Sequence, residues 1–176
     1  MKRYILTGTP GSGKTTVIHA LKRKGYAVVE EAATDVITLE QSNGILEPWT
    51  HPSFIHTILQ LQIHREHQAI EAPIQFFDRS PICTYALCTF LNYPIPVQLT
   101  QKINRITTAH VFQQNVFFLE NLGCIQPTDA RKISFKDALR FEKIHKDVYQ
   151  YFGYTLIILP HTSEDNRLHK TLTWID

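Results

Sequence analysis

The amino-acid sequence predicts an α/β fold in which a five-stranded parallel sheet carries helices on both faces. Five short segments are continuously apolar, which is typical of strands buried on both sides. Stretches of helical character separate them, as expected where crossover helices join parallel strands. A glycine-rich segment lies between the first strand and the first helix. The 176 residues suit one domain over 1–176, in which we expect a lid-like loop at about 121–133.

Glycine and proline bound the elements of the first half of the chain. In order, we expect a strand over 2–7, a helix over 14–24, a strand over 26–29, a helix that ends at about 41 and a helix over 51–72. In the first helix apolar residues recur at helical spacing, and Gly25 ends it. Gly44 follows the second helix, and Pro73 ends the third.

Capping residues mark the later helices. In order, we expect a strand over 74–77, helices over 81–92 and about 97–109, a strand over 115–120, a helix over 134–152, a strand over 155–159 and a last helix that starts at about 163. Ser134 can accept a hydrogen bond from a free amide, and Asp137 suits the positive end of that helix. Ser163 precedes the last helix in the same way. Lys102 and Arg105 lie on a mixed helix face that we expect to be solvated.

Composition and charge exclude several classes of protein. Lys+Arg number 18 and Asp+Glu 16, so the formal net charge is +2, and no basic run indicates a binder of long nucleic acids. No apolar run approaches the roughly 20 residues that span a membrane, and the first apolar segment is too short for a signal peptide. The three cysteines lack metal-site spacing; we expect reduced thiols in a cytoplasmic protein, with Cys83 and Cys88 as core residues.

The segment Gly8-Thr9-Pro10-Gly11-Ser12-Gly13-Lys14-Thr15 matches the pattern G-x-x-x-x-G-K-[ST] at every fixed position. Glycines let the backbone curl so that its N–H groups point at phosphate oxygens, and the following helix adds the positive end of its dipole. We expect Lys14 to reach the β- and γ-phosphates and the Thr15 hydroxyl to bind Mg²⁺. The predicted nucleotide-binding residues are Gly8, Pro10, Gly11, Ser12, Gly13, Lys14, Thr15 and Thr16.

Charged residues follow three expected strands, at the edge where parallel sheets bind ligands. Asp78 is placed to hold Mg²⁺ directly or through water, and Arg79 to clamp a phosphoryl group. Of Glu30 and Glu31, alternation along the strand points only one toward the cleft, where it could accept a proton from a substrate hydroxyl. Arg131, after the fourth strand, could close over the transferring phosphate.

Each of these residues also has a purely structural interpretation. Asp78 and Arg79 would suit a solvated surface turn, Glu30 and Glu31 an ordinary helix start, and the loop around Arg131 a solvated basic segment. The long helix over 51–72 adds further candidates for substrate contact, namely the polar side chains of Gln60, Gln62 and Arg65.

These motifs resemble the small P-loop AAA-type ATPase and kinase domains similar to the ribosylnicotinamide kinase domain of NadR. The resemblance covers nearly the whole chain and rests on Gly8 to Thr16, Val29-Glu30-Glu31-Ala32-Ala33, Phe77-Asp78-Arg79-Ser80-Pro81, and the run from Val116-Phe117-Phe118 through Arg131 to Leu159-Pro160. Deoxynucleoside kinases have a similar layout, with a carboxylate after the second strand and Asp-Arg-Ser after the third. The resemblance implies the P-loop NTPase fold, with Glu31 as the candidate base, Arg79 as the phosphate clamp and Arg131 as a lid residue.

The leading hypothesis is an ATP- and Mg²⁺-dependent phosphotransferase that acts on a small hydroxyl acceptor, with nucleosides among the candidates. In it Lys14 holds the phosphates, Thr15 and Asp78 serve Mg²⁺, Glu31 orients or deprotonates the acceptor, and Arg79 and Arg131 offset developing charge.

The alternative hypothesis is a nucleotide-binding ATPase or GTPase regulator without an acceptor. GTP stays open as the nucleotide, although the guanine-reading pattern Asn-Lys-x-Asp is absent. The two hypotheses differ in one structural feature. A kinase should leave a pocket beside Glu31 and Arg79 for a second substrate, and a regulator need not.

Overall fold

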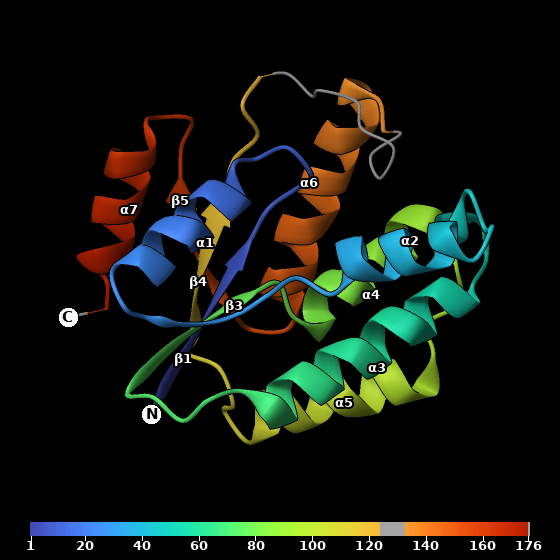
Figure 1. Ribbon diagram of the computed structural model, residues 1–176, viewed down its shortest axis with the longest axis horizontal. Coiled ribbons are helices and arrows are strands. Elements are labelled where there is room, and N and C mark those ends of the chain that lie inside the picture. The colour runs from blue at the N-terminus through green and yellow to red at the C-terminus, as the bar shows by residue number, and fades with distance from the viewer. Residues whose placement is uncertain (124–132, 176) are drawn as a thin grey trace.

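The computed structural model describes residues 1–123 and 133–175, in which one or two α-helices separate each strand from the next (Figure 1). Its strands are β1 (Lys2–Thr7), β2 (Ala27–Val29), β3 (Ile74–Asp78), β4 (Asn115–Leu119) and β5 (Thr155–Leu159). Its helices are α1 (Lys14–Arg23), α2 (Ala33–Ser42), α3 (Ser53–Gln68), α4 (Pro81–Leu91), α5 (Val97–Thr108), α6 (Phe135–Tyr151) and α7 (Glu164–Leu172), with a short 3₁₀ helix at Pro48–Thr50.

The five strands form one all-parallel sheet in the order β2-β3-β1-β4-β5, which confirms the predicted sheet. The central strand β1 therefore lies between β3 and β4, with Leu6 opposite Asp78 on one side and Phe117 on the other. The strand order reverses at this point, and parallel sheets bind ligands beyond the carboxyl ends of strands at such a reversal. The segment after β1 lies at that edge.

Side chains alternate between two cores because successive strand residues point to opposite faces. One core, against α1 and α7, contains Tyr4, Leu6, Phe76 and Phe117. The other, against α3 to α6, contains Ile5, Phe77 and Val116. Figure 1 shows α1 and α7 on one side of the sheet and α3 to α6 on the other, so the expectation of helices on both faces is confirmed.

A third apolar cluster joins α2 to α3 away from the sheet. Its buried residues are Ala32, Val36, Ile37, Phe54 and Ile58. This cluster fixes the start of α2, and so the turn that follows β2, against the first two turns of the long helix α3. Among the described residues no helix is both long and apolar enough to cross a membrane.

The helix starts agree with the predicted caps, but α3 differs from its expected length. Ser134 accepts a hydrogen bond from the Asp137 amide at 3.0 Å, and Ser163 accepts one from the Asn166 amide at 3.3 Å. The expected helix over 51–72 was too long: α3 ends at Gln68 because Ala69 takes an extended conformation, several residues before Pro73.

The expectation that Lys102 is solvated was wrong. Lys102 Nζ lies 2.8 Å from Glu66 Oε2 in an ion pair between α5 and α3, and the two side chains are only 5% and 8% exposed. The periodicity of one helix cannot show that another helix packs over its mixed face. The buried pair fixes α5 against α3.

We expect Lys102→Met to lower the free energy of unfolding by about 3–5 kcal/mol, because it leaves the buried Glu66 carboxylate without a partner. Urea unfolding measures this loss, and the double variant with Glu66→Met should recover most of it. The control is Lys143→Met, which breaks the Lys143–Asp147 pair, whose side chains are 79% and 58% exposed, and should cost less than about 1 kcal/mol. Equal costs for the two single variants would contradict the prediction.

Candidate functional site

The glycine-rich loop between β1 and α1 has a backbone that larger residues cannot adopt. Gly8 has φ +143°, and a Cβ on it would lie 2.3 Å from the Leu119 carbonyl oxygen. Gly13 has φ +80° directly before α1, where no described side chain caps the helix. Glycine alone tolerates both conditions without strain. The first amides of α1 remain available to an anion bound at the loop.

Lys14 is buried inside this loop and contacts the loop itself. Its Nζ donates hydrogen bonds to the Thr9 carbonyl oxygen at 3.0 Å and to Ser12 Oγ at 3.4 Å. Burial, with a smaller contribution from the nearby charge of Arg79, lowers the pKa of Lys14 to about 8. An anion in the loop would compensate this buried ammonium group better than the two oxygens do.

The end of β3 presents Arg79 toward the loop through an unusual backbone conformation. Arg79 has φ +71°, and its amide donates to the Leu6 carbonyl oxygen of β1 at 2.9 Å. Its guanidinium Nε donates to Glu31 Oε1 in an ion pair whose side chains are 10% and 20% exposed. The strained residue therefore directs a buried cation at the carboxylate that follows β2.

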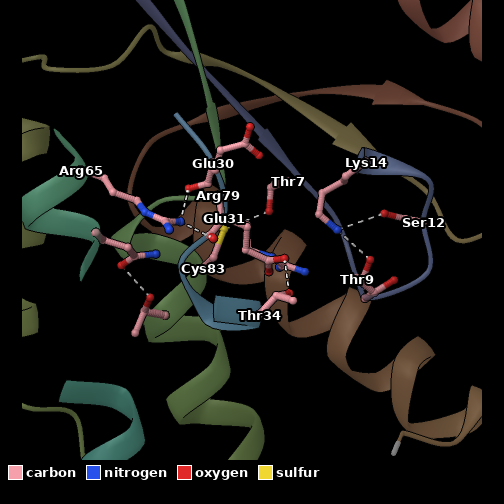
Figure 2. A network of polar contacts seen from close by, with 12 residues as sticks. Thr7, Thr9, Ser12, Lys14, Glu30, Glu31, Thr34, Arg65, Arg79 and Cys83 are labelled. Carbon is pink, nitrogen blue, oxygen red and sulfur yellow. Dashed lines mark hydrogen bonds and ion pairs between the residues drawn. The ribbon is translucent and has the colours of Figure 1, made fainter. Parts of the chain in front are cut away.

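Two further residues hold Glu31. Thr34 Oγ1 donates to Glu31 Oε2 at 2.9 Å, so both carboxylate oxygens have a partner. Arg65 of α3 donates to the carbonyl oxygens of Glu30 and Glu31 (Figure 2). It also pairs with Asp35. Burial raises the pKa of Glu31, but the charges of Arg79 and Lys14 and the two hydrogen bonds outweigh burial and hold it at about 2.

The two candidate acids after β2 separate, as strand alternation predicted. Glu31 lines a large cavity next to the glycine-rich loop, whereas Glu30 is half exposed and pairs with Lys22 of α1. Figure 2 shows Lys14 on one side of the site and the Glu31–Arg79 pair on the other.

Asp78 is a buried carboxylate with an unused oxygen. The residue is 8% exposed, and its Oδ1 has no hydrogen-bond partner among the described residues. Burial raises its pKa to about 6, with the attraction of Lys14 opposing this shift and the repulsion of Glu31 adding to it. Asp78 lines a small cavity together with the exposed Thr15. A carboxylate oxygen and a hydroxyl form a donor set that fits Mg²⁺, which prefers oxygen ligands.

One large cavity extends from the loop to the aromatic side chains beyond it. Its volume is about 970 Å³, and the loop end is lined by Pro10, Gly11, Gly13, Lys14, Thr15 and Thr16. Glu31 and Arg79 lie in its wall. The far end is largely apolar, with Trp49, Phe54, Ile58, Leu87, Phe90 and Phe141. Its polar groups include Gln62, Thr84 and Arg140, whose guanidinium lies over the Phe90 ring. The cavity therefore offers an anion site and a separate apolar site with Glu31 and Arg79 in its wall.

A buried polar chain lies behind the loop, and sequence reasoning missed it. The Cys83 sulfur lies 3.0 Å from Thr7 Oγ1 and 3.0 Å from the Tyr149 hydroxyl, which is 2.8 Å from Ser80 Oγ. Cys83 is thus buried as expected, but it also lines the large cavity. These hydrogen bonds connect β1, α4 and α6, and no local sequence pattern indicates contacts between residues so far apart in the sequence. Arg131, the expected lid residue, lies outside the described residues.

Solved structures show the same fold. Deoxyadenosine kinase from M. mycoides with bound dATP has 14% identity and a TM-score of 0.61, and the alignment covers 98% of each chain. The NadR protein in complex with NR has 17% identity and a TM-score of 0.68 over 98% of this chain and 49% of that chain. At these identities the likeness establishes the α/β P-loop NTPase fold.

Sequence comparisons agree with the motifs. A segment of 46 residues is 46% identical to the replication factor C large subunit of Pyrobaculum arsenaticum; it covers 26% of this chain and 11% of that protein. A family profile described as an AAA domain matches residues 3–167, nearly the whole chain. Together with the structural neighbours, this match confirms the resemblance drawn from the motifs. The chain belongs to the AAA domain family and has the α/β P-loop NTPase fold.

Proposed function

We propose that this protein is an ATP- and Mg²⁺-dependent phosphotransferase that acts on a hydroxyl group of a small, nucleoside-like molecule. One observation carries the proposal: a single cavity has the phosphate loop at one end, the Glu31–Arg79 pair in its wall and an apolar site at the other end. A regulator that only binds a nucleotide has no use for the second site, so the space favours a kinase over the alternative.

On the donor side, Lys14 and the amides at the start of α1 would bind the β- and γ-phosphates. Asp78 and Thr15 would hold Mg²⁺, which neutralises phosphate charge when it is bound. Arg79 is always protonated and would offset the charge that develops on the transferring group. Arg131 is proposed to add a further cation after β4.

On the acceptor side, Glu31 would orient the hydroxyl by accepting a hydrogen bond from it. With a pKa near 2 and both oxygens already bonded, this carboxylate is a weak proton acceptor. Phosphoryl transfer proceeds through a loose transition state in which positioning outweighs proton removal. Orientation is therefore the role that the contacts of Glu31 support.

The far end of the cavity suits a planar ring with a polar edge. Phe54 and Phe141 supply apolar contact, and Thr84 Oγ1 donates to Gln62 Oε1 at 2.9 Å. Within the described residues no hydrogen bond is recorded for the Gln62 amide nitrogen, so it can donate to a carbonyl group on the acceptor. The structural neighbour deoxyadenosine kinase binds dATP, and this likeness adds support to a nucleoside-like acceptor.

The direct test is a product-resolved assay with ATP, Mg²⁺ and pooled nucleosides, read by mass spectrometry. We expect a phosphorylated acceptor, and we expect Lys14→Ala to reduce its formation by at least about a hundredfold, because the phosphates lose their main cation. The matched control is Lys22→Ala in the same helix, where the side chain is half exposed and pairs with Glu30. Release of inorganic phosphate with no phosphorylated product would support the regulator instead.

A second prediction concerns Asp78. Its pKa is raised to about 6 in the folded protein, above its value of about 3.9 in the unfolded chain, so the folded state binds more protons between these values and stability falls as pH rises through them. Asp78→Asn should raise the melting temperature of the metal-free protein by roughly 2–6 °C at pH 8 and by much less near pH 4.5. The same variant should lose the stabilisation by Mg²⁺ and ATP.

Differential scanning fluorimetry at the two pH values measures both effects of Asp78→Asn. Asp147→Asn, at an exposed position on α6, serves as the control and should show neither effect. A lower melting temperature of Asp78→Asn at pH 8 would contradict the cost of the buried charge, and a retained response to Mg²⁺ and ATP would contradict the proposed metal site.

A third prediction concerns acceptor recognition. Gln62→Glu removes the free amide donor, so it should raise KM for the acceptor by about tenfold or more and change KM for ATP less than twofold. Steady-state kinetics with the acceptor found in the screen measures both constants. Gln60→Glu is the matched control, because it places the same charge on an exposed position of α3 that does not line the cavity. Equal effects of the two variants would exclude Gln62 from the acceptor site.

A further inference from the structure

A buried arginine of α7 joins three loops at the edge of the sheet where the ligand site lies. Arg167 is 3% exposed. Its Nε donates to the Pro160 carbonyl oxygen at 2.7 Å, one terminal nitrogen donates to the Glu120 carbonyl oxygen at 3.0 Å, and the other donates to the Ser12 carbonyl oxygen. These carbonyls follow β5, β4 and β1, so one guanidinium group fixes the phosphate loop to the ends of the two neighbouring strands.

The charge of Arg167 has no ion-pair partner within residues 1–123 and 133–175. Burial lowers its pKa, and the charge of Glu120 only partly opposes this shift. An arginine nonetheless stays protonated in proteins, so a full positive charge is held in place by three carbonyl dipoles. A buried cation of this kind is poorly compensated unless an anion lies nearby.

Arg167 lies behind the loop and not in the ligand site. It lines neither the large cavity nor the small one. One terminal nitrogen is 3.2 Å from the position that a Cβ on Gly13 would take, which places the guanidinium against the last residue before α1. The Ser12 carbonyl that accepts from Arg167 belongs to the same peptide group as the Gly13 amide. Hydrogen bonding to one end of a peptide group strengthens donation at the other.

We propose that Arg167 is a positioning residue for the phosphate groups of the bound nucleotide. It fixes the Ser12–Gly13 peptide, and by binding the Ser12 carbonyl oxygen it strengthens the Gly13 N–H as a hydrogen-bond donor to phosphate. The proposal rests on nucleotide binding at the loop and does not depend on phosphoryl transfer. Lysine cannot replace the group, because one ammonium on a flexible stem does not span three carbonyls in a plane.

The test compares Arg167→Met and Arg167→Lys with the wild-type protein in titration calorimetry. The two probes are MgATP and magnesium tripolyphosphate, which carries phosphates without a nucleoside. The matched control is Arg23→Met, which breaks the exposed contact between Arg23 of α1 and Glu164 of α7 without touching the loop. Titrations are made well below the melting temperature of each variant, so that only folded protein is compared.

We expect Arg167→Met to weaken both probes by the same factor, on the order of tenfold to a hundredfold, since the loss of a hydrogen bond that involves a charged group has effects of this size. Arg167→Lys should be intermediate, because it keeps the charge but not the three contacts. Arg23→Met should bind both probes as the wild type does. In turnover assays Arg167→Lys should raise KM for ATP and leave KM for the acceptor and kcat unchanged, a split that a loss of stability alone would not produce.

Unchanged affinity of Arg167→Lys for tripolyphosphate would overturn the proposal, and so would a loss confined to MgATP, which would place Arg167 at the nucleoside. Should Arg167→Met not fold, Arg167→Lys decides by the same criteria. Absence of phosphoryl transfer to every acceptor, with these binding changes intact, would overturn the proposed reaction and leave the role of Arg167 standing.

Discussion

The ion pair between Glu31 and Arg79 is the interaction on which the site depends, because it joins the neighbouring strands β2 and β3 beyond Val29 and Phe77, where their pairing in the sheet stops. Glu31 follows the three-residue edge strand β2, and Arg79 follows β3 in a strained left-handed conformation. Neither position would be stable with the side chain unpaired, since burial of a lone charge is costly. With Lys14 and Asp78 nearby, four largely buried charges of both signs lie together, and burial and the neighbouring charges both act on the pKa of each.

The features that could be predicted best from the sequence are those that depend on residues close together in the chain. The strand bounds, the glycine-rich loop and the serine caps depend on neighbouring residues, so composition and spacing were sufficient to predict them. The placement of Asp78 and Arg79 could be predicted because parallel strands end at a common edge. The two acids after β2 were predicted to diverge, but only the structure identifies Glu31 as the one that meets Arg79.

The remaining features required knowledge of which elements touch. Lys102 on an apparently mixed helix face meets Glu66 of another helix, and Cys83 completes a polar chain between β1 and α6. Arg167 is more than 150 positions along the chain from the loop carbonyl that it binds. In each case the partner is set by helix packing, and a hydrophobic pattern contains no information about a specific contact at that range.

The position of β2 at the margin of the sheet has a consequence for how such a protein can diversify. Its three residues pair with β3 only, and the α2–α3 cluster that supports Glu31 is separate from the two cores that flank the sheet. The loop, by contrast, grows out of the central strand and is clamped by α7. The donor end of the cavity is thus built on the central strand, whereas α2 and the first turns of α3 line part of its acceptor end from a cluster outside the two main cores. Substitutions on the cavity-facing sides of α2 and α3 can therefore change which acceptor fits, while the phosphate loop and its contacts with α7 stay unchanged.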